Sequence, residues 1–121
     1  MEITSVSPIF PADDLAASID VYTRQLGFDL AWSWGSPPDI AAVCRGRIEI
    51  TLKQRAEAMP TGPADAYVHV SGVDALYTAF EAAGVEVRVP IGDRPYGMRD
   101  FRIVDPGGNA LSFGQPIAGV T

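Results

Sequence analysis

The sequence predicts the same order of structural elements in its two halves, and this repeat constrains the fold more than any other feature. In each half an apolar strand precedes a helix, and three further strands follow it. Both helices stop at a glycine, Gly27 and Gly84, a residue that readily adopts the left-handed conformation which closes helices. Neither half of a 121-residue chain could bury its sheet face alone. We therefore predict an α+β fold of two β-α-β-β-β modules that share a core.

The first module is predicted over residues 1–53 and opens with a strand and a helix. The strand is expected over residues 3–10, where Pro8 indicates a sheet edge or an irregularity. Asp13 or Asp14 can cap the helix that follows, because a carboxylate accepts hydrogen bonds from the free N–H groups of a first turn. One apolar stripe at helical spacing marks the helix, formed by Leu15, Ile19, Tyr22 and Leu26.

Three strands are predicted to complete this module. Residues 28–34 alternate between apolar and polar side chains, the pattern of a half-buried strand. Residues 40–44 and 47–53 are expected to form a hairpin around Arg45-Gly46. The alternation places four side chains on one face of the 28–34 strand, namely Phe28, Leu30, Trp32 and Trp34.

A polar segment rich in proline and glycine, residues 54–64, is predicted to link the modules. The second module is predicted over residues 65–116. Its helix is expected at 73–83, with Val73, Leu76, Phe80 and Ala83 facing inward. Its strands are expected at 66–71, 85–89, 98–104 and 110–115, with a loop over 90–97 and a turn over 105–109.

Two segments resemble the vicinal oxygen chelate superfamily, which includes glyoxalase I, extradiol dioxygenases and bleomycin-resistance proteins. The first runs from Asp14-Leu15 through Ser18-Ile19-Asp20-Val21-Tyr22 to Leu26-Gly27-Phe28, and the second is Phe101-Arg102-Ile103-Val104-Asp105-Pro106-Gly107-Gly108-Asn109. The resemblance implies a single domain over residues 1–121, with curved mixed sheets around a groove and helices outside. It also implies a homodimer whose grooves both chains complete. One fold of this kind hosts many activities.

In members that use a metal, the resemblance implies one ligand on the first and one on the last strand of each module. Residue counting places these four positions at Ser7, Glu49, Val68 and Ser112. Only Glu49 is a good ligand, and a divalent ion needs several charged or imidazole donors. A strand bulge could add His69, which would still give only two strong donors. We therefore predict no bound metal and no other cofactor.

Composition narrows the partners further. The net charge of −6 argues against nucleic-acid binding and favours cationic or neutral partners. The only cysteine, Cys44, excludes an internal disulfide. The absence of a basic, apolar leader and of any apolar run of about 20 residues predicts a cytoplasmic protein without a membrane span.

The candidate ligand-binding residues are mostly aromatic or charged. Indole rings can stack on flat ligands or hold cations, although core packing of Trp32 and Trp34 is the alternative. Glu49 could meet a cation, act as a base or simply face solvent, and a lone histidine such as His69 is more often packed or superficial than catalytic. The complete predicted set is Trp32, Trp34, Glu49, His69, Tyr96, Met98, Arg99 and Ser112.

The leading hypothesis is therefore a non-catalytic protein that sequesters a small planar or cationic natural product, as in self-resistance to an antibiotic. No nucleophile with a paired base stands out, and no catalytic residue is assigned. The alternative is a lyase, isomerase or dioxygenase, either metal-dependent through Glu49 and His69 or metal-free with Glu49 as the base. A third possibility is an accessory domain that only dimerises.

Overall fold

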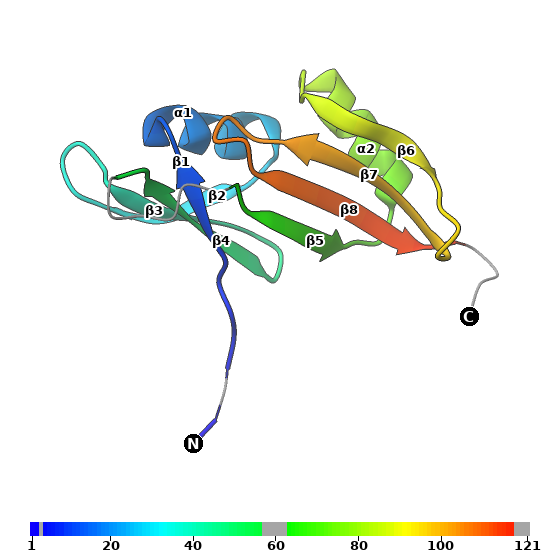
Figure 1. Cartoon of the computed structure of the whole chain (residues 1–121), viewed down its shortest axis with the longest axis horizontal. Helices are drawn as coiled ribbons and strands as arrows, with labels where there is room; N and C mark the ends of the chain where they lie inside the picture. Colours follow the sequence, from blue (N-terminus) through cyan, green and yellow to red (C-terminus); the bar gives the residue numbers. More distant parts are fainter. Residues whose placement is uncertain (3, 57–62, 118–121) are drawn as a thin grey trace.

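Two four-stranded sheets lie side by side along the long axis of the molecule in the computed structural model, which describes residues 1–2, 4–56 and 63–117 (Figure 1). The first sheet has the strand order β1-β4-β3-β2, and the second has the equivalent order β5-β8-β7-β6. In each sheet the outer β1–β4 or β5–β8 pair is parallel and the other pairs are antiparallel. The predicted α+β fold with two βαβββ modules and mixed sheets is thus confirmed.

The elements of the first module follow the predicted order. They are β1 (Ile9–Ala12), α1 (Leu15–Asp20), the π-helical segment η1 (Val21–Gln25), β2 (Asp29–Trp34), β3 (Ile40–Arg45) and β4 (Ile48–Gln54). The elements of the second module are β5 (Asp65–His69), α2 (Val73–Ala82), β6 (Val87–Asp93), β7 (Met98–Val104) and β8 (Ala110–Pro116).

Several predicted boundaries were wrong. The first strand begins at Ile9 rather than at residue 3, because β1 is a short edge strand that pairs only with the last four residues of β4. Strand β6 extends to Asp93, into the predicted loop over 90–97, and its pairing with β7 contains two register shifts. The predicted linker is shorter at its start, since Gln54 belongs to β4, and residues 57–62 of it lie outside the described residues.

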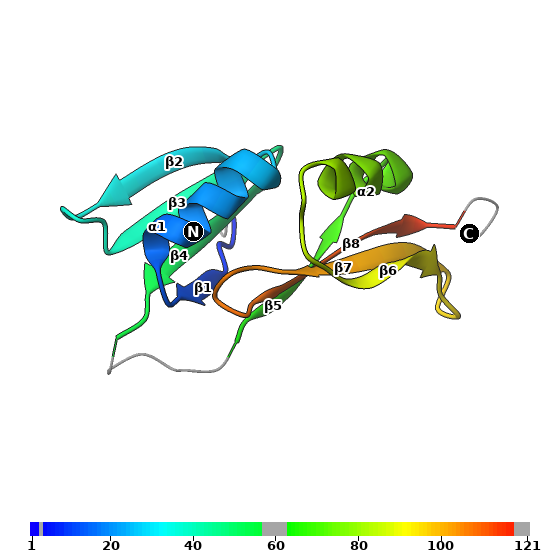
Figure 2. The ribbon, with the colours of Figure 1, turned by 90° about the horizontal axis from the view of Figure 1, so that it is seen from above.

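The first helix lies across β3 and β4 (Figure 2) and begins as predicted. The Asp14 side chain accepts a hydrogen bond of 3.2 Å from the Ala17 N–H and so caps the first turn. The helix continues as the π-helical segment η1, which the sequence pattern did not predict, and Gly27 follows it with a φ of +74°. In α2 the inward position of Ala83 was wrong, because this residue is exposed.

A bulge in β2 changes which residues share a face. Leu30 pairs with Val43, but Trp32 pairs with Ala42, so one extra residue intervenes in β2. An extra residue reverses the alternation of side chains beyond it. Trp32 and Trp34 therefore lie on the face opposite to Leu30, and the single apolar face predicted for this strand was wrong.

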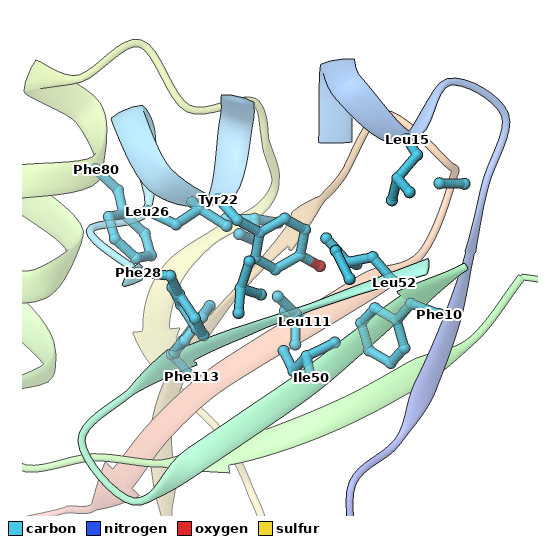
Figure 3. Close-up of a cluster of buried hydrophobic side chains, with 14 of the residues drawn as sticks. Phe10, Leu15, Tyr22, Leu26, Phe28, Ile50, Leu52, Phe80, Leu111 and Phe113 are labelled. Carbon is cyan, nitrogen blue, oxygen red and sulfur yellow. The ribbon is translucent and has the colours of Figure 1, made fainter. Parts of the chain in front are cut away.

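One hydrophobic core joins the two modules. Figure 3 shows side chains from both sheets and from α1, η1 and α2 in the same buried cluster. The largest members are Phe10, Leu15, Tyr22, Leu26, Phe28, Ile50, Leu52, Phe80, Phe101, Ile103, Leu111 and Phe113. The helix-covered faces of the two sheets thus form the inside of the molecule.

The turn between β7 and β8 fastens the modules together by hydrogen bonds. The buried Asp105 carboxylate accepts a bond of 2.8 Å from the Tyr22 hydroxyl of the first module. It also accepts bonds from the N–H groups of Gly107 and Asn109, and the Asn109 amide donates to the Pro11 carbonyl at 2.7 Å. This buried network holds the turn against the first module.

Candidate functional site

Each sheet has an open face, which we define as the face that its helix does not cover. Cross-strand partners share a face, so the strand registers assign every residue. On the first sheet, Trp32, Ala42, Thr51 and Ile9 form one row of the open face, and Cys44 and Glu49 belong to a neighbouring row. On the second sheet, Tyr67, Ser112 and Arg102 form one row, and His69, Gly114 and Asp100 form the next.

The two tryptophans are exposed on the open face of the first sheet. Trp32 is 45% exposed and Trp34 is 68% exposed, values well above those of core aromatics such as Phe28 at 3%. Exposed indoles gain little from the core, and they offer flat apolar surfaces to a ligand or partner. Core packing is therefore not the role of either tryptophan within this chain.

Glu49 and His69 line the same cavity of about 490 Å³ where β4 faces β5. Tyr67 lines this cavity as well, together with residues from the segment before β1. The first half of β4 has no strand on this side, because β1 begins its pairing only at Thr51. A volume of this size suits a small organic molecule. The cavity brings together two residues that the sequence analysis had singled out.

The residues at the four metal-ligand positions do not fit a divalent cation. Val68 was the wrong third position, because it lies on the helix-covered face, and the residue paired with Ser112 on the open face is Tyr67. The Ser7 hydroxyl bonds to the Thr51 hydroxyl at 3.1 Å, beside Glu49. Within residues 1–2, 4–56 and 63–117, no group of three or more His, Cys, Asp or Glu side chains could hold a metal ion.

A cluster of four polar side chains lies on the open face of the second sheet. The Asp100 carboxylate accepts hydrogen bonds from the hydroxyls of Tyr67, at 2.9 Å, and Tyr96, at 2.6 Å. It also accepts a bond of 2.8 Å from the Arg94 guanidinium, with which it forms an ion pair. We call these four residues the Asp100 cluster.

The Asp100 cluster shifts the pKa values of its members. Burial of the Tyr67 hydroxyl, and then its bond to Asp100, raise the pKa of Tyr67 to about 12. The bond to Asp100 also raises the pKa of Tyr96. Burial opposes ionisation of Asp100, but the bonds from Arg94 and the two tyrosines outweigh it and lower the pKa of this carboxyl. The cluster thus holds an ionised carboxylate and two protonated tyrosines at neutral pH.

We predict that three tyrosines ionise at a higher pH in the folded protein than in the unfolded chain. Three of the four tyrosines, Tyr22, Tyr67 and Tyr96, have raised pKa values, so phenolate absorbance should develop later than in the unfolded chain. A raised pKa in the folded state means that the bond to Tyr67 stabilises the protein fully below a pH of about 10 and is lost as the pH rises through about 12. Ultraviolet titration with and without denaturant measures this, and four tyrosines titrating alike in both states would contradict it.

The other predicted site residues occupy three different surroundings. Arg99 lies on the helix-covered face, where it forms ion pairs with Asp74 and Asp93, so it does not join the open face. Ser112 is on the open face but buried beneath its neighbours, and Arg102 donates to it at 3.4 Å. Met98 is half-buried at the start of β7 on the open face.

Tyr67 and Asp100 were missed as site residues, although one signal could have identified them. Gly114 lies in the middle of a strand, where a glycine often marks the close approach of another group. A Cβ at Gly114 would lie 2.0 Å from the Tyr67 hydroxyl oxygen and 2.9 Å from the Asp100 Cβ. Gly114 in the sequence therefore indicated that another group approaches this strand closely, but it did not indicate which residues do so.

A second cavity of about 540 Å³ opens on the helix-covered side of the same gap between the modules. Arg47, Ile48, Val68 and His69 line both cavities. Its walls are mainly core side chains such as Phe28, Leu76 and Phe113.

In the part of the chain that the structure describes, no helix is long and apolar enough to span a membrane.

Comparison with known sequences identifies relatives that align with most of the chain. The chain is 28% identical to the bleomycin resistance protein of Geobacillus stearothermophilus, over 91% of this chain and 95% of that protein. The bleomycin resistance protein of Staphylococcus aureus gives the same values.

Solved structures share the fold at lower identity. The bleomycin-binding protein of Streptomyces verticillus, solved with copper(II)-bleomycin, has a TM-score of 0.76 and 24% identity, with coverage of 93% of this chain and 96% of that one. Lactoylglutathione lyase of Agrobacterium tumefaciens has a TM-score of 0.74 and 24% identity, with coverage of 94% and 95%. The model of the Glyoxalase/Bleomycin resistance protein/Dioxygenase superfamily matches residues 5–113. With this match over most of its length, and with two βαβββ modules in its fold, the chain belongs to the Glyoxalase/Bleomycin resistance protein/Dioxygenase superfamily.

Proposed function

We propose that this protein binds and sequesters a small natural product with planar aromatic and cationic parts, of the kind that bleomycin represents. The observation that carries the proposal is the exposure of Trp32 and Trp34 on an open sheet face. Two large indoles exposed on neighbouring rows of one strand form an apolar surface that flat rings can stack on. Relatives named bleomycin resistance protein, which match over nearly their whole length, support the same class of ligand.

Charge supports a ligand with a cationic part. The chain has a net charge of −6, which attracts cations from solution. Among the described residues the exposed Glu49 carboxylate makes no ion pair, so it can meet a positive group in the cavity that it shares with His69. Stacking on the indoles and attraction to Glu49 would then act on different parts of one molecule.

We further propose a homodimer in which the open faces of two chains enclose the ligand. An open face with exposed indoles leaves one side of a stacked ligand in water, and a second copy would cover it. Enclosure from both sides is typical of pockets that hold a small molecule tightly. Light scattering of the purified protein tests this arrangement through the mass of the particle.

Titration of the purified protein with bleomycin, metal-free and copper-loaded, tests the function. We expect a change in tryptophan fluorescence that saturates at one ligand per chain, and calorimetry should give the same stoichiometry. A panel of planar cationic antibiotics extends the search if bleomycin is not the natural ligand. No response from any member at tens of micromolar protein would overturn the proposal.

A metal-dependent lyase or dioxygenase is the second candidate, and the shared cavity of Glu49 and His69 is the observation that favours it. These two donors fall short of the set that a divalent ion requires. Metal analysis of the protein as purified separates the candidates, because stoichiometric zinc, nickel, manganese or iron would favour the enzyme over the binding protein.

A further inference from the structure

We infer that Tyr67 and Tyr96 form a stacking platform for an uncharged planar ring, and that Asp100 is the residue that positions both tyrosines. The inference rests on the proposed function, since it assigns a second subsite and its ligand chemistry to the same binding protein. Trp32 and Trp34 belong to the first sheet, whereas this platform belongs to the second.

The two rings are available to a ligand while their hydroxyls are fixed. Tyr67 is 40% exposed and Tyr96 is 66% exposed, but Asp100 is only 5% exposed. Both hydroxyls donate to the same carboxylate oxygen, Oδ2, at 2.9 Å and 2.6 Å. A side chain anchored at its far end loses less conformational freedom when a ligand covers its ring, which favours binding. The buried carboxylate thus acts through the tyrosines and does not itself reach the ligand.

Charge balance within the cluster determines the kind of ring. The Arg94 guanidinium donates from Nε to Oδ1 of Asp100 at 2.8 Å and from Nη2 to the Asp100 carbonyl at 2.9 Å. The positive charge therefore lies directly against the negative one, and both tyrosines are neutral at physiological pH. A neutral platform recognises a flat ring by its apolar faces, without a requirement for charge.

The glycine in the neighbouring strand leaves the space that Tyr67 and Asp100 occupy. Strand β8 passes under the platform at Gly114, where even one methyl group would collide with the Tyr67 hydroxyl and come within 2.9 Å of the Asp100 Cβ. Asp100 and Gly114 are direct cross-strand partners, so this spacing is set by the sheet. The space over Gly114 and the bond to Asp100 together fix the position of the Tyr67 hydroxyl.

Glu49 differs from Asp100 because its carboxylate is open to solvent and can meet a charged group of a ligand directly. Its carboxylate is exposed and lines the cavity that Tyr67 also lines, so the two subsites adjoin. A ligand that spans them would place a cationic group beside Glu49 and an uncharged aromatic ring on Tyr67 and Tyr96. Glu49 would then attract the cationic part of the ligand, whereas Asp100 would position the two tyrosines.

Two probes with the same ring separate these roles: acridine, which is neutral at pH 8, and N-methylacridinium, which is a permanent cation. We expect Asp100→Asn to weaken the binding of both probes by the same factor of about two- to tenfold, the range for one aromatic stacking contact. Glu49→Gln should weaken only the cationic probe. Asp93→Asn is the matched control, because it makes the same chemical change at a carboxylate that pairs with Arg99 on the helix-covered face.

A double-mutant cycle distinguishes positioning from a general loss of structure. The Tyr67→Phe/Tyr96→Phe variant keeps both rings but removes their bonds to Asp100, so it should weaken the probes as Asp100→Asn does. Adding Asp100→Asn to it should cause little further loss, because the two changes remove the same contact. Ultraviolet titration gives an independent readout, since Asp100→Asn should lower the pKa values of Tyr67 and Tyr96 and leave the raised pKa of Tyr22, which bonds to Asp105, unchanged.

The outcomes separate this inference from the proposed function. If the wild-type protein binds neither acridines nor bleomycin, the proposed function fails and the platform fails with it. If the wild-type protein binds the probes and Asp100→Asn binds them as well as Asp93→Asn does, only the platform is overturned. Additive losses in the cycle, or a loss confined to the cationic probe, would overturn it too.

Discussion

Replacing Asp105 by alanine is expected to lower the free energy of unfolding by about 3–5 kcal/mol, the usual cost of removing one member of a buried hydrogen-bonded network. Asp105 is 4% exposed and accepts bonds from the Tyr22 hydroxyl, from two backbone N–H groups and from the Asn109 amide. All of these donors would remain buried without their acceptor. Urea denaturation followed by circular dichroism measures the loss.

Two further variants give the stability losses with which the loss from Asp105→Ala is compared. Tyr22→Phe removes one of the bonds between the modules and leaves the rest of the network, so it should cost about 1–2 kcal/mol. Asp13→Ala removes an exposed ion pair with Arg55 and should change stability by less than about 1 kcal/mol. If Asp105→Ala were as mild as Asp13→Ala, the turn would not be the fastening between the modules.

Replacing Trp32 and Trp34 together by alanine is expected to reduce bleomycin affinity at least about tenfold, since exposed tryptophans at a binding face are typical hot spots. The same change should cost little stability, because both side chains are largely exposed and contribute little to the core. Isothermal titration calorimetry measures the affinity, and thermal unfolding measures the stability of the same samples.

Leu30→Ala is the matched control for the tryptophans. Leu30 is 47% exposed and belongs to the same strand, but the bulge places it on the opposite face. It should therefore leave affinity unchanged. Equal losses from Leu30→Ala and from the tryptophan variant would contradict a binding surface on the open face of β2.

The sequence was sufficient for the modules because their signals are local. The apolar stripe of the first helix, its Asp14 cap and the closing turn at residues 105–109 each depend on near neighbours in the chain. The period-two pattern of β4 likewise separated Ile48, Ile50 and Leu52 from Glu49 on the other face. Such patterns follow from the geometry of one helix or one strand, which the sequence alone specifies.

The candidate site was harder to predict from the sequence, because strand register decides which of its residues come together. A single extra residue in β2 moved both tryptophans to the open face, and an error of one position in β5 exchanged Val68 for Tyr67. Side chains alternate with a period of two, so any miscount of one reverses every assignment beyond it. Register depends on pairing partners that can be distant in the chain, and residue counting does not see them.

The Asp100 cluster illustrates the same division. The sequence by itself determined a β strand with alternating polar residues and a glycine in the neighbouring strand. Only the tertiary structure decided that Tyr67, from a strand 33 residues away, would place its hydroxyl over that glycine and on the Asp100 carboxylate. The repeat therefore determined two modules, while the contacts between strands, which depend on long-range packing, decided where a ligand can bind.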